Sequence, residues 1–232
     1  MATEKSLDSR LLSALPYLSG DGIAADIGSD HAYLPIEIIK RGMARRAVAC
    51  DINQGPIEAA RRNIAAAGLT DRIDTLKTDG LHGVENFHPT DIMIFGMGGE
   101  LITAILSAAP WIRNPAIGLI LQPMTKGEVL RSWLLENGFS ILDETLTYED
   151  QYYQTIHARF GGETERYSAE ELWFGKRILK GESPHLEGYL RRKCAVLTAV
   201  VEGKRRGGAD ASLEEELLSA LERRLEERGI RS

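Results

Sequence analysis

Five short apolar runs alternate with longer amphipathic segments through the first part of the chain. Short apolar runs bounded by glycine or polar residues indicate buried strands, and the spacing of apolar residues between them indicates helices. We expect strands at Ile23–Ile27, Ala47–Asp51, Ile73–Lys77, Ile92–Phe95 and Gly118–Gln122. We expect helices at Leu34–Arg41, Pro56–Ala67, Leu101–Ala109 and Lys126–Asn137. Repeated strand–helix units predict an α/β fold with a doubly wound parallel sheet.

The pattern changes after the fifth of these units. Phe139–Tyr148 and Tyr152–Phe160 are strand-like runs with no helix signal between them. They predict an antiparallel pair at the end of the sheet. A terminal antiparallel pair after five strand–helix units resembles the class I methyltransferase fold, which is Rossmann-like, whereas a dinucleotide-binding fold more often continues with another strand–helix unit.

The end of the chain is expected to be helical. Gly161–Gly162 begins a polar linker, so we expect one domain over residues 1–161 and a second over residues 162–232. A coiled-coil seam with steps of three and four residues is formed by Leu186, Leu190, Lys193, Leu197, Val200 and Lys204. After a turn at Gly203–Asp210, a second apolar stripe is formed by Leu213, Leu217, Leu221 and Leu225. Together they predict a helical hairpin packed as an antiparallel coiled coil.

Composition excludes few classes of protein. The 232 residues are 43% hydrophobic and 27% charged, with a net charge of −6, as in ordinary globular proteins. No apolar run reaches the roughly 18 residues of a membrane span, and the first residues show no signal-peptide core. The two cysteines, Cys50 and Cys194, have no metal-ligand spacing. We therefore expect a cytoplasmic protein with no membrane and no metal, and we treat it as a monomer.

The turn after the first strand carries the first chemical signal. Gly28 ends the strand, and a dinucleotide fingerprint would place a second glycine at position 30. Asp30 stands there instead, and its carboxylate would repel a diphosphate. Asp26 adds a second acid at the end of the strand. These residues favour S-adenosylmethionine, which is cationic and has no phosphate, although an ordinary strand–helix turn remains an alternative.

Acids also end the second and third strands. Asp51 lies 23 residues after Gly28, at the position of the acid that binds ribose hydroxyls in nucleoside-binding α/β folds. Ile52 then suits the face of an adenine, and Asn53 begins the next helical region. Asp79 and Gly80 suit the adenine amino group and a chain turn, respectively. The alternative for Asp51 is a helix cap.

The fourth strand ends in Gly96-Met97-Gly98-Gly99, where glycine lets the backbone approach ligands closely. This loop lacks the polar residue and paired prolines typical of adenine-N6 methyltransferases, which disfavours exocyclic amines as targets. It also lacks the cysteine that cytosine-C5 chemistry needs as a nucleophile. Met97 contacts a substrate or packs against the wall of the site.

Three motifs carry a specific resemblance: Asp26-Ile-Gly-Ser-Asp-His-Ala-Tyr-Leu-Pro35, Gly96-Met-Gly-Gly99 and Leu121-Gln-Pro-Met124. With them, the chain resembles the bacterial tRNA (adenine-22-N1)-methyltransferase family over nearly its whole length. The resemblance implies a class I methyltransferase domain followed by a helical domain. It also implies S-adenosylmethionine as cofactor and N1 of an adenine in the D-arm region of tRNA as target.

Site residues are expected as follows. The expected cofactor-binding residues are Asp26, Gly28, Ser29, Asp30, His31, Asp51, Ile52, Asn53, Asp79, Gly80, Gly96, Met97 and Gly98. Asp30 and Tyr33 are the candidate catalytic residues, because a carboxylate stabilises a cationic product ring and an aromatic ring stacks on a base. Tyr33 packing its helix onto the sheet is the alternative.

Phosphate contacts would hold the tRNA in register. The candidates are Lys5, Arg10, Lys126 and Arg131, together with Arg45 and Arg46, near the catalytic face, and Arg191, Arg192, Lys193, Lys204, Arg205 and Arg206 in the tail. The two tail triplets lie on one predicted helix and suggest a basic stripe, although each side chain alone suits an ordinary solvated face. The alternative functions are a methyltransferase for another RNA or a small molecule, a non-catalytic S-adenosylmethionine-binding module, and a nicotinamide-dependent enzyme, which Asp30 disfavours.

Overall fold

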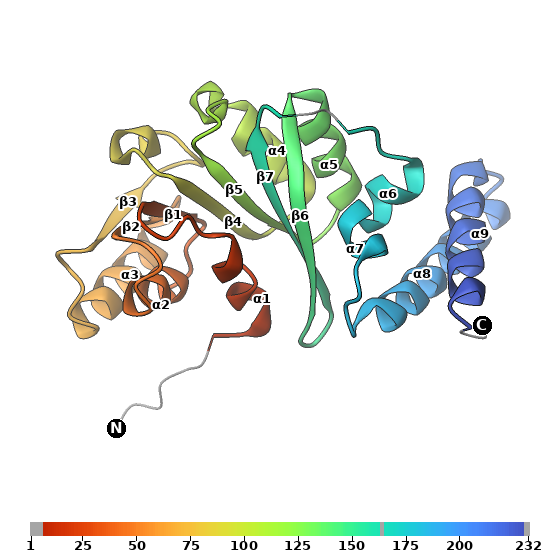
Figure 1. Cartoon of the computed structure of the whole chain (residues 1–232), viewed down its shortest axis with the longest axis horizontal. Helices are drawn as coiled ribbons and strands as arrows, with labels where there is room; N and C mark the ends of the chain where they lie inside the picture. The colour runs from red at the N-terminus through yellow and green to blue at the C-terminus, as the bar shows by residue number, and fades with distance from the viewer. Residues whose placement is uncertain (1–6, 163–164, 230–232) are drawn as a thin grey trace. The chain divides into compact units, whose positions relative to one another are not determined.

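Strand direction and order define the first part of the molecule (Figure 1). The computed structural model describes residues 7–162 and 165–229, and in this part of the chain seven strands form one sheet in the order β3-β2-β1-β4-β5-β7-β6. The strands are β1 (Ile23–Ile27), β2 (Arg46–Asp51), β3 (Ile73–Lys77), β4 (Asp91–Met97), β5 (Gly118–Pro123), β6 (Phe139–Tyr148) and β7 (Tyr152–Phe160). The neighbours among β1 to β5 are parallel, whereas β7 is antiparallel to both β5 and β6.

Helices cover both faces of this sheet. Those of the first unit are α1 (Ser9–Leu12), α2 (Tyr33–Lys40), α3 (Gln54–Ala66), α4 (Gly99–Ser107) and α5 (Gly127–Glu136). Short 3-10 helices occur at Leu15–Tyr17, Val84–Phe87 and Pro110–Ile112. Helices α2 and α3 lie on one side of the sheet, and α4 and α5 lie on the other (Figure 1). The sheet is therefore doubly wound.

The central strands are apolar because both of their faces are covered. All six residues of β5 are buried, as are four of the five in β1. Ile27 at the end of β1 pairs with Cys50 of β2 and with Ile94 of β4. The carboxyl ends of these three strands therefore meet at one edge, on either side of the point where the strand order reverses. In open α/β sheets this is where ligands bind.

The predicted α/β fold is confirmed, including the terminal antiparallel pair. β1, β3, β6 and β7 have the predicted bounds, whereas β4 extends two residues further, to Met97. Helix ends differ from the predictions by one or two residues. α3, for example, begins at Gln54 rather than Pro56. The largest omission is α1, which the apolar pattern did not reveal.

The chain divides into two compact units, Met1–Arg166 and Tyr167–Ser232, so the division falls five residues later than our domain prediction. The described helices of the second unit are α6 (Ala169–Phe174), α7 (Lys176–Lys180), α8 (Leu186–Arg206) and α9 (Ser212–Glu227). A capping box joins Ser168 and Glu171 at the start of α6. Glu170 of α6 forms an ion pair with Arg224 of α9.

Helices α8 and α9 pack against each other as a hairpin, but the predicted seam is only partly buried. Val200 is 38% exposed, and Val201 is buried in its place. The buried series Leu186, Leu190, Leu197 and Val201 follows the 3.6-residue period of a straight helix more closely than a 3.5-residue seam. On α9, Leu213 is exposed. The coiled-coil geometry of the pair stays a prediction.

Candidate active site

Two neighbouring cavities lie at the carboxyl edge of the sheet. The larger, of about 390 Å³, is lined by residues that include Asp8, Arg10, Asp26, Gly28, Asp30 and Tyr33. The smaller, of about 170 Å³, is lined by residues that include Gly28, Asp51, Ile52, Asp79, Met97 and Leu101. Gly28 belongs to both walls. The larger cavity is therefore rich in charged groups, whereas the smaller cavity combines carboxylates with apolar side chains.

Asp26 is the buried acid of the larger cavity. It is 7% exposed, and burial raises the pKa of its carboxyl to about 6. The nearby Ser29 hydroxyl and the Arg10 guanidinium lower this pKa, whereas the charge of Asp51 raises it. A carboxylate held in this way is stabilised by any cation that enters the cavity. Asp26 is therefore suited to an ammonium group.

The turn after β1 is fixed by its backbone. The amide groups of Gly28 and Ser29 both donate to the carbonyl oxygen of Cys50, over 2.9 and 2.8 Å. His31 and Ala32 both adopt left-handed backbone conformations, with φ of 61° and 57°. The Asn63 amide holds the first of these by donating to the His31 carbonyl over 2.9 Å. This strained turn starts α2 and presents its side chains at the mouth of the larger cavity.

Asp30, His31 and Tyr33 form a polar and aromatic group at that mouth. His31 Nε2 lies 3.1 Å from Asp30 Oδ1, and the His31 ring stacks on the Tyr33 ring with 5.5 Å between centroids. Tyr33 is 36% exposed. An exposed aromatic ring can stack on a planar ring, and a carboxylate beside it favours positive charge on that ring. This arrangement therefore suits a nucleobase at the cavity entrance.

The smaller cavity has polar and apolar walls. Asp51 Oδ1 accepts a hydrogen bond from the backbone amide of Asn53 over 2.7 Å, which orients the carboxylate at the end of β2. Ile52 and Leu101, both more than half exposed, are among the apolar groups of the wall. Leu101 and its neighbour Ile105 come from α4, and the sequence reasoning missed both, because only the packing of α4 brings them to the strand ends.

The glycine segment after β4 lies against the backbone that follows β5. The Gly99 amide donates to the Thr125 carbonyl over 2.7 Å, and the Met124 amide donates to the Met97 carbonyl over 2.8 Å. A β-carbon at Gly99 would stand 2.1 Å from the Lys126 carbonyl oxygen. This close approach explains the last glycine of the motif. Within the described structure, Ser29, His31, Asn53 and Gly98 flank the two cavities without lining them.

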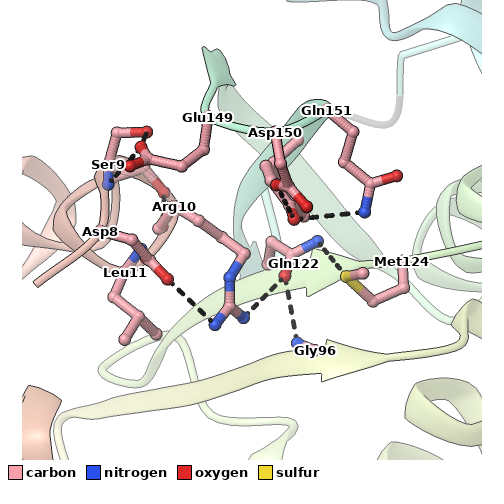
Figure 2. A network of polar contacts seen from close by, with 12 residues as sticks. Asp8, Ser9, Arg10, Leu11, Gly96, Gln122, Met124, Glu149, Asp150 and Gln151 are labelled. Atoms are coloured by element: carbon pink, nitrogen blue, oxygen red, sulfur yellow. Dashed lines mark hydrogen bonds and ion pairs between the residues drawn. The ribbon is translucent and has the colours of Figure 1, made fainter.

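Gln122 connects the ends of β4 and β5 to α1. Its buried Oε1 accepts from the Gly96 amide over 3.1 Å and from Arg10 Nη1 over 3.4 Å, as Figure 2 shows. The Leu121–Met124 motif drew attention to this residue without giving it a role. Arg10, which we expected to bind RNA, lines the larger cavity.

One predicted phosphate contact in the first unit, Arg131, is wrong, and so is the placement of Arg45 and Arg46 near the catalytic face. Arg131 is 0% exposed, and its guanidinium is bound to Glu144 over 2.6 Å and to Gln154 over 2.5 Å. A side chain enclosed in this way has no surface to offer to a phosphate. Arg45 and Arg46 lie at the start of β2, at the opposite end of the strand from the cavities. Lys126 is exposed, and Lys5 lies outside the described residues.

The tail candidates are mostly engaged within their own unit. Arg191 forms an ion pair with Glu187, Lys204 with Glu214, and Arg205 with Glu215. Lys193 lies over the Tyr189 ring, Arg206 donates to the Glu202 carbonyl, and Arg192 is exposed. The pairs of Arg191 and Arg205 are exposed and contribute only about 0–1 kcal/mol each, so a phosphate can replace their carboxylate partners.

Helix geometry changes the predicted basic stripe. At about 100° per residue, positions 13 apart such as 191 and 204 point to different sides of α8, whereas positions 14 apart share a face. Arg191 therefore shares a face with Arg205, and Arg192 with Arg206. Two narrow basic rows replace the single stripe that the triplets suggested.

The described residues include neither a cluster of metal-binding side chains nor a helix suited to a membrane. No group of three or more histidine, cysteine, aspartate or glutamate side chains could hold a metal ion there. None of the helices in that part of the chain combines the length and the apolar character needed to cross a membrane.

Comparison with known proteins extends these observations. A family model described as tRNA (adenine(22)-N(1))-methyltransferase matches residues 24–224. A protein of the same description from Bacillus subtilis is 34% identical over 176 residues, which cover 75% of this chain and 74% of the relative.

Solved structures agree with this match. Sp1610 from Streptococcus pneumoniae, in complex with S-adenosyl-L-methionine, is 31% identical with a TM-score of 0.81, covering 92% of this chain and 100% of that one. TrmK from M. capricolum, in complex with S-adenosyl-homocysteine, is 27% identical with a TM-score of 0.77, covering 93% and 99% of the two chains. The chain belongs to the tRNA (adenine(22)-N(1))-methyltransferase family.

Proposed function

We propose that this protein transfers a methyl group from S-adenosylmethionine to N1 of adenine 22 in tRNA. The observation that carries the proposal is the pair of cavities joined at Gly28, with Asp51 in one and Asp26 in the other, in a member of this family. Similar chains are described as tRNA (adenine(22)-N(1))-methyltransferases or are solved with S-adenosylmethionine or its product. The proposal includes action in the cytoplasm, as a monomer.

The residues fit a nucleoside joined to an amino acid. In the smaller cavity, Asp51 would accept hydrogen bonds from the ribose hydroxyls, and Ile52 and Leu101 would flank the adenine. Asp79 and Gly80 would face the adenine edge. In the larger cavity, the buried Asp26 would receive the ammonium group. The remaining cofactor predictions, Ser29, His31, Asn53, Gly96, Met97 and Gly98, would hold the walls in place.

The chemistry requires positioning more than proton transfer. The cofactor supplies an electrophilic methyl group on its sulfonium. N1 of an unpaired adenine has a free lone pair, so no residue has to act as a base before attack. Asp30 at the cavity mouth would stabilise the positive charge that the methylated ring acquires. Tyr33 would stack on the base, and His31 would hold Asp30 and Tyr33 in place.

The tRNA must expose its adenine before the Watson–Crick edge can react, at a cost of a few kcal/mol. Phosphate contacts would offset this cost. We propose that the second unit supplies part of them through the two basic rows of α8. Its role as a tRNA-binding aid is supported by its exposed arginines Arg191, Arg192 and Arg205.

The test is methyl transfer to unmodified tRNA transcripts, followed by identification of the modified nucleoside. We expect 1-methyladenosine in a transcript with adenine at position 22, and no product when that position is guanine. Methylation of another nucleoside, or of another adenine with equal efficiency, would contradict the proposal. Calorimetry with S-adenosylhomocysteine and NAD is the control for cofactor class, and we expect binding of the first alone.

A further inference from the structure

We propose that Arg10 binds the carboxylate at the amino-acid end of the cofactor, and that α1 is a strap that holds Arg10 in the cavity. The inference rests on the proposed function, because it assumes that S-adenosylmethionine occupies the larger cavity. It replaces our sequence-based expectation that Arg10 contacts RNA. It also gives a role to a helix of only four residues that the sequence pattern did not reveal.

Arg10 is placed to meet a ligand. Its side chain is 22% exposed and lines the larger cavity. The guanidinium contacts its protein partners at long range, with 3.4 Å from Nη1 to Gln122 Oε1 and 3.5 Å from Nη2 to Asp8 Oδ2. It also lies over the Tyr153 ring, 5.7 Å from the centroid. A guanidinium has five N–H donors in a planar fork, so these contacts leave donors for a carboxylate.

The charges of the cavity match an amino acid. Asp8, Asp26 and Asp30 line it, and Arg10 is the one cationic side chain among the described residues of its wall. An amino acid carries an ammonium and a carboxylate on the same carbon. Its binding site therefore needs an anionic and a cationic side chain close together. Arg10 is near enough to the buried Asp26 to lower the pKa of that carboxyl. A phosphate of RNA would instead meet three carboxylates and a largely covered guanidinium.

Side-chain hydrogen bonds fasten α1 at both ends. Ser9 donates to Glu149 Oε2, from its amide over 3.1 Å and from its hydroxyl over 2.5 Å. At the other end, the Ser13 and Thr155 hydroxyls are 2.6 Å apart. Asp8 caps the helix by accepting from the Leu11 amide over 2.8 Å. Figure 2 shows Arg10 between this cap and Gln122.

A helix of one turn is not stable by itself, so these bonds decide where α1 lies. Glu149 belongs to the turn between β6 and β7, and Thr155 lies on β7. The hairpin that completes the sheet thus also positions Arg10. This role accounts for the hydrogen bonds between Ser9 of α1 and Glu149 of the β6–β7 turn, which are 140 residues apart in the chain.

The experiment measures the affinity of Arg10→Ala for two ligands by calorimetry at pH 8. S-adenosylmethionine has the carboxylate, and decarboxylated S-adenosylmethionine lacks it but retains the ammonium and sulfonium. We expect the variant to bind S-adenosylmethionine about 10- to 100-fold more weakly than the wild type. We expect its affinity for the decarboxylated ligand to stay within about twofold of the wild-type value. Arg45→Ala, at the opposite end of the sheet, is the matched control and should change neither affinity.

Two more variants separate contact from folding. Arg10→Lys keeps the charge and should restore part of the lost affinity for S-adenosylmethionine. Ser9→Ala loosens the strap, so it should weaken S-adenosylmethionine binding in the wild-type background and have no further effect in Arg10→Ala. Thermal unfolding of each variant checks that the fold is retained.

Three results would overturn the inference. Equal loss of both ligands in Arg10→Ala would make Arg10 a structural residue, and loss of neither would remove it from the cofactor site. If Arg10→Ala kept its cofactor affinity but bound tRNA with a shallower salt dependence, Arg10 would be an RNA contact, as the sequence first suggested. If the wild type bound neither ligand, the proposed function itself would fail, and this result is distinct because it appears before any variant is made.

Discussion

The terminal methyl group of Met97 occupies the space that a side chain at Gly28 would need. A β-carbon at Gly28 would stand 2.4 Å from Met97 Cε, closer than two carbon atoms can approach without bonding. The contact joins the turn after β1 to the end of β4, and Gly28 lines both cavities. A side chain at Gly28 would therefore have to displace the Met97 methyl group at a point that borders both cavities.

Gly28→Ala is expected to weaken cofactor binding by displacing Met97 into the smaller cavity. Its backbone φ of +76° also disfavours alanine, by roughly 1–2 kcal/mol. Gly42→Ala is the matched control, because Gly42 has a φ of +68° and nothing lies within 4 Å of its added carbon. Both variants should lose similar unfolding free energy, whereas calorimetry should detect weaker S-adenosylmethionine binding only for Gly28→Ala. Equal cofactor affinity in the two variants would show that the contact is irrelevant to the site.

Asp26→Asn is expected to stabilise the protein without ligand while weakening cofactor binding. The pKa of Asp26 is raised from 3.8 to about 6, so the folded state binds its proton more tightly than the unfolded chain does. The charged form therefore lowers the free energy of unfolding at neutral pH, by up to about 3 kcal/mol. Asparagine removes this charge. Urea denaturation at pH 7.5 measures the gain, and a variant less stable than the wild type would contradict it.

The same pKa gives a pH dependence. Because the folded pKa lies above the unfolded value, the stability contributed by protonated Asp26 is present below about pH 4 and is lost as the pH rises through about 6. Cofactor affinity should change in the opposite direction, since only the ionised carboxylate attracts an ammonium. We expect S-adenosylmethionine binding to the wild type to weaken below pH 6 by at most about tenfold per pH unit. Asp26→Asn should show a flatter profile over the same range.

Asp51→Ala is expected to weaken S-adenosylmethionine binding by roughly 1.5–3 kcal/mol, through loss of charge-assisted hydrogen bonds to the ribose. The carboxylate is already oriented by the Asn53 amide, so little ordering is needed when a ligand binds. Asp71→Ala, at an exposed position just before β3 and away from the carboxyl ends of the strands, serves as the control. Wild-type affinity in a folded Asp51→Ala protein would remove this residue from the site.

Tyr33→Ala is expected to leave cofactor binding unchanged and to lower methyl transfer to tRNA. Stacking of a base on an aromatic ring contributes about 1–3 kcal/mol, and the Tyr33 ring is exposed at the cavity mouth against His31. Single-turnover methylation measures the effect. Tyr33→Phe should retain activity if stacking is the role, whereas full activity of both variants would leave Tyr33 as a packing residue of α2.

The sheet and much of the site could be predicted because their signals are local. Asp26, Gly28 and Asp51 occupy strand ends that apolar runs define, and parallel strands bring such ends together. Arg10 and Arg131 could not be placed in this way. The partners of Arg10 lie across the fold, such as Gln122, 112 residues later. Arg131 is buried by Glu144 on β6, whereas a charged residue on a helix usually predicts exposure.

Removal of Tyr167–Ser232 is expected to leave a folded protein that still binds S-adenosylmethionine. The first unit contains the whole sheet and both cavities, and every residue proposed to hold the cofactor precedes α5. The truncated protein should bind tRNA more weakly and with a shallower dependence on salt. Each lost phosphate contact reduces the slope of log affinity against log salt concentration by roughly 0.7–0.9. Calorimetry with cofactor, and tRNA titrations at several salt concentrations, measure the two effects.

Neutralising the basic rows of α8 tests the same role without removing the second unit. Arg191→Gln, Arg192→Gln and Arg205→Gln combined should reproduce part of the loss in tRNA affinity and salt slope. Their side chains are exposed, and Arg191 and Arg205 form exposed ion pairs that contribute little to stability, so we expect the triple variant to fold. If neither the truncation nor the triple variant alters tRNA affinity or its salt slope, the second unit serves stability or self-association. Sedimentation of the truncated and full-length proteins would then distinguish these two roles, because only loss of self-association changes the molecular mass in solution beyond that of the deleted residues.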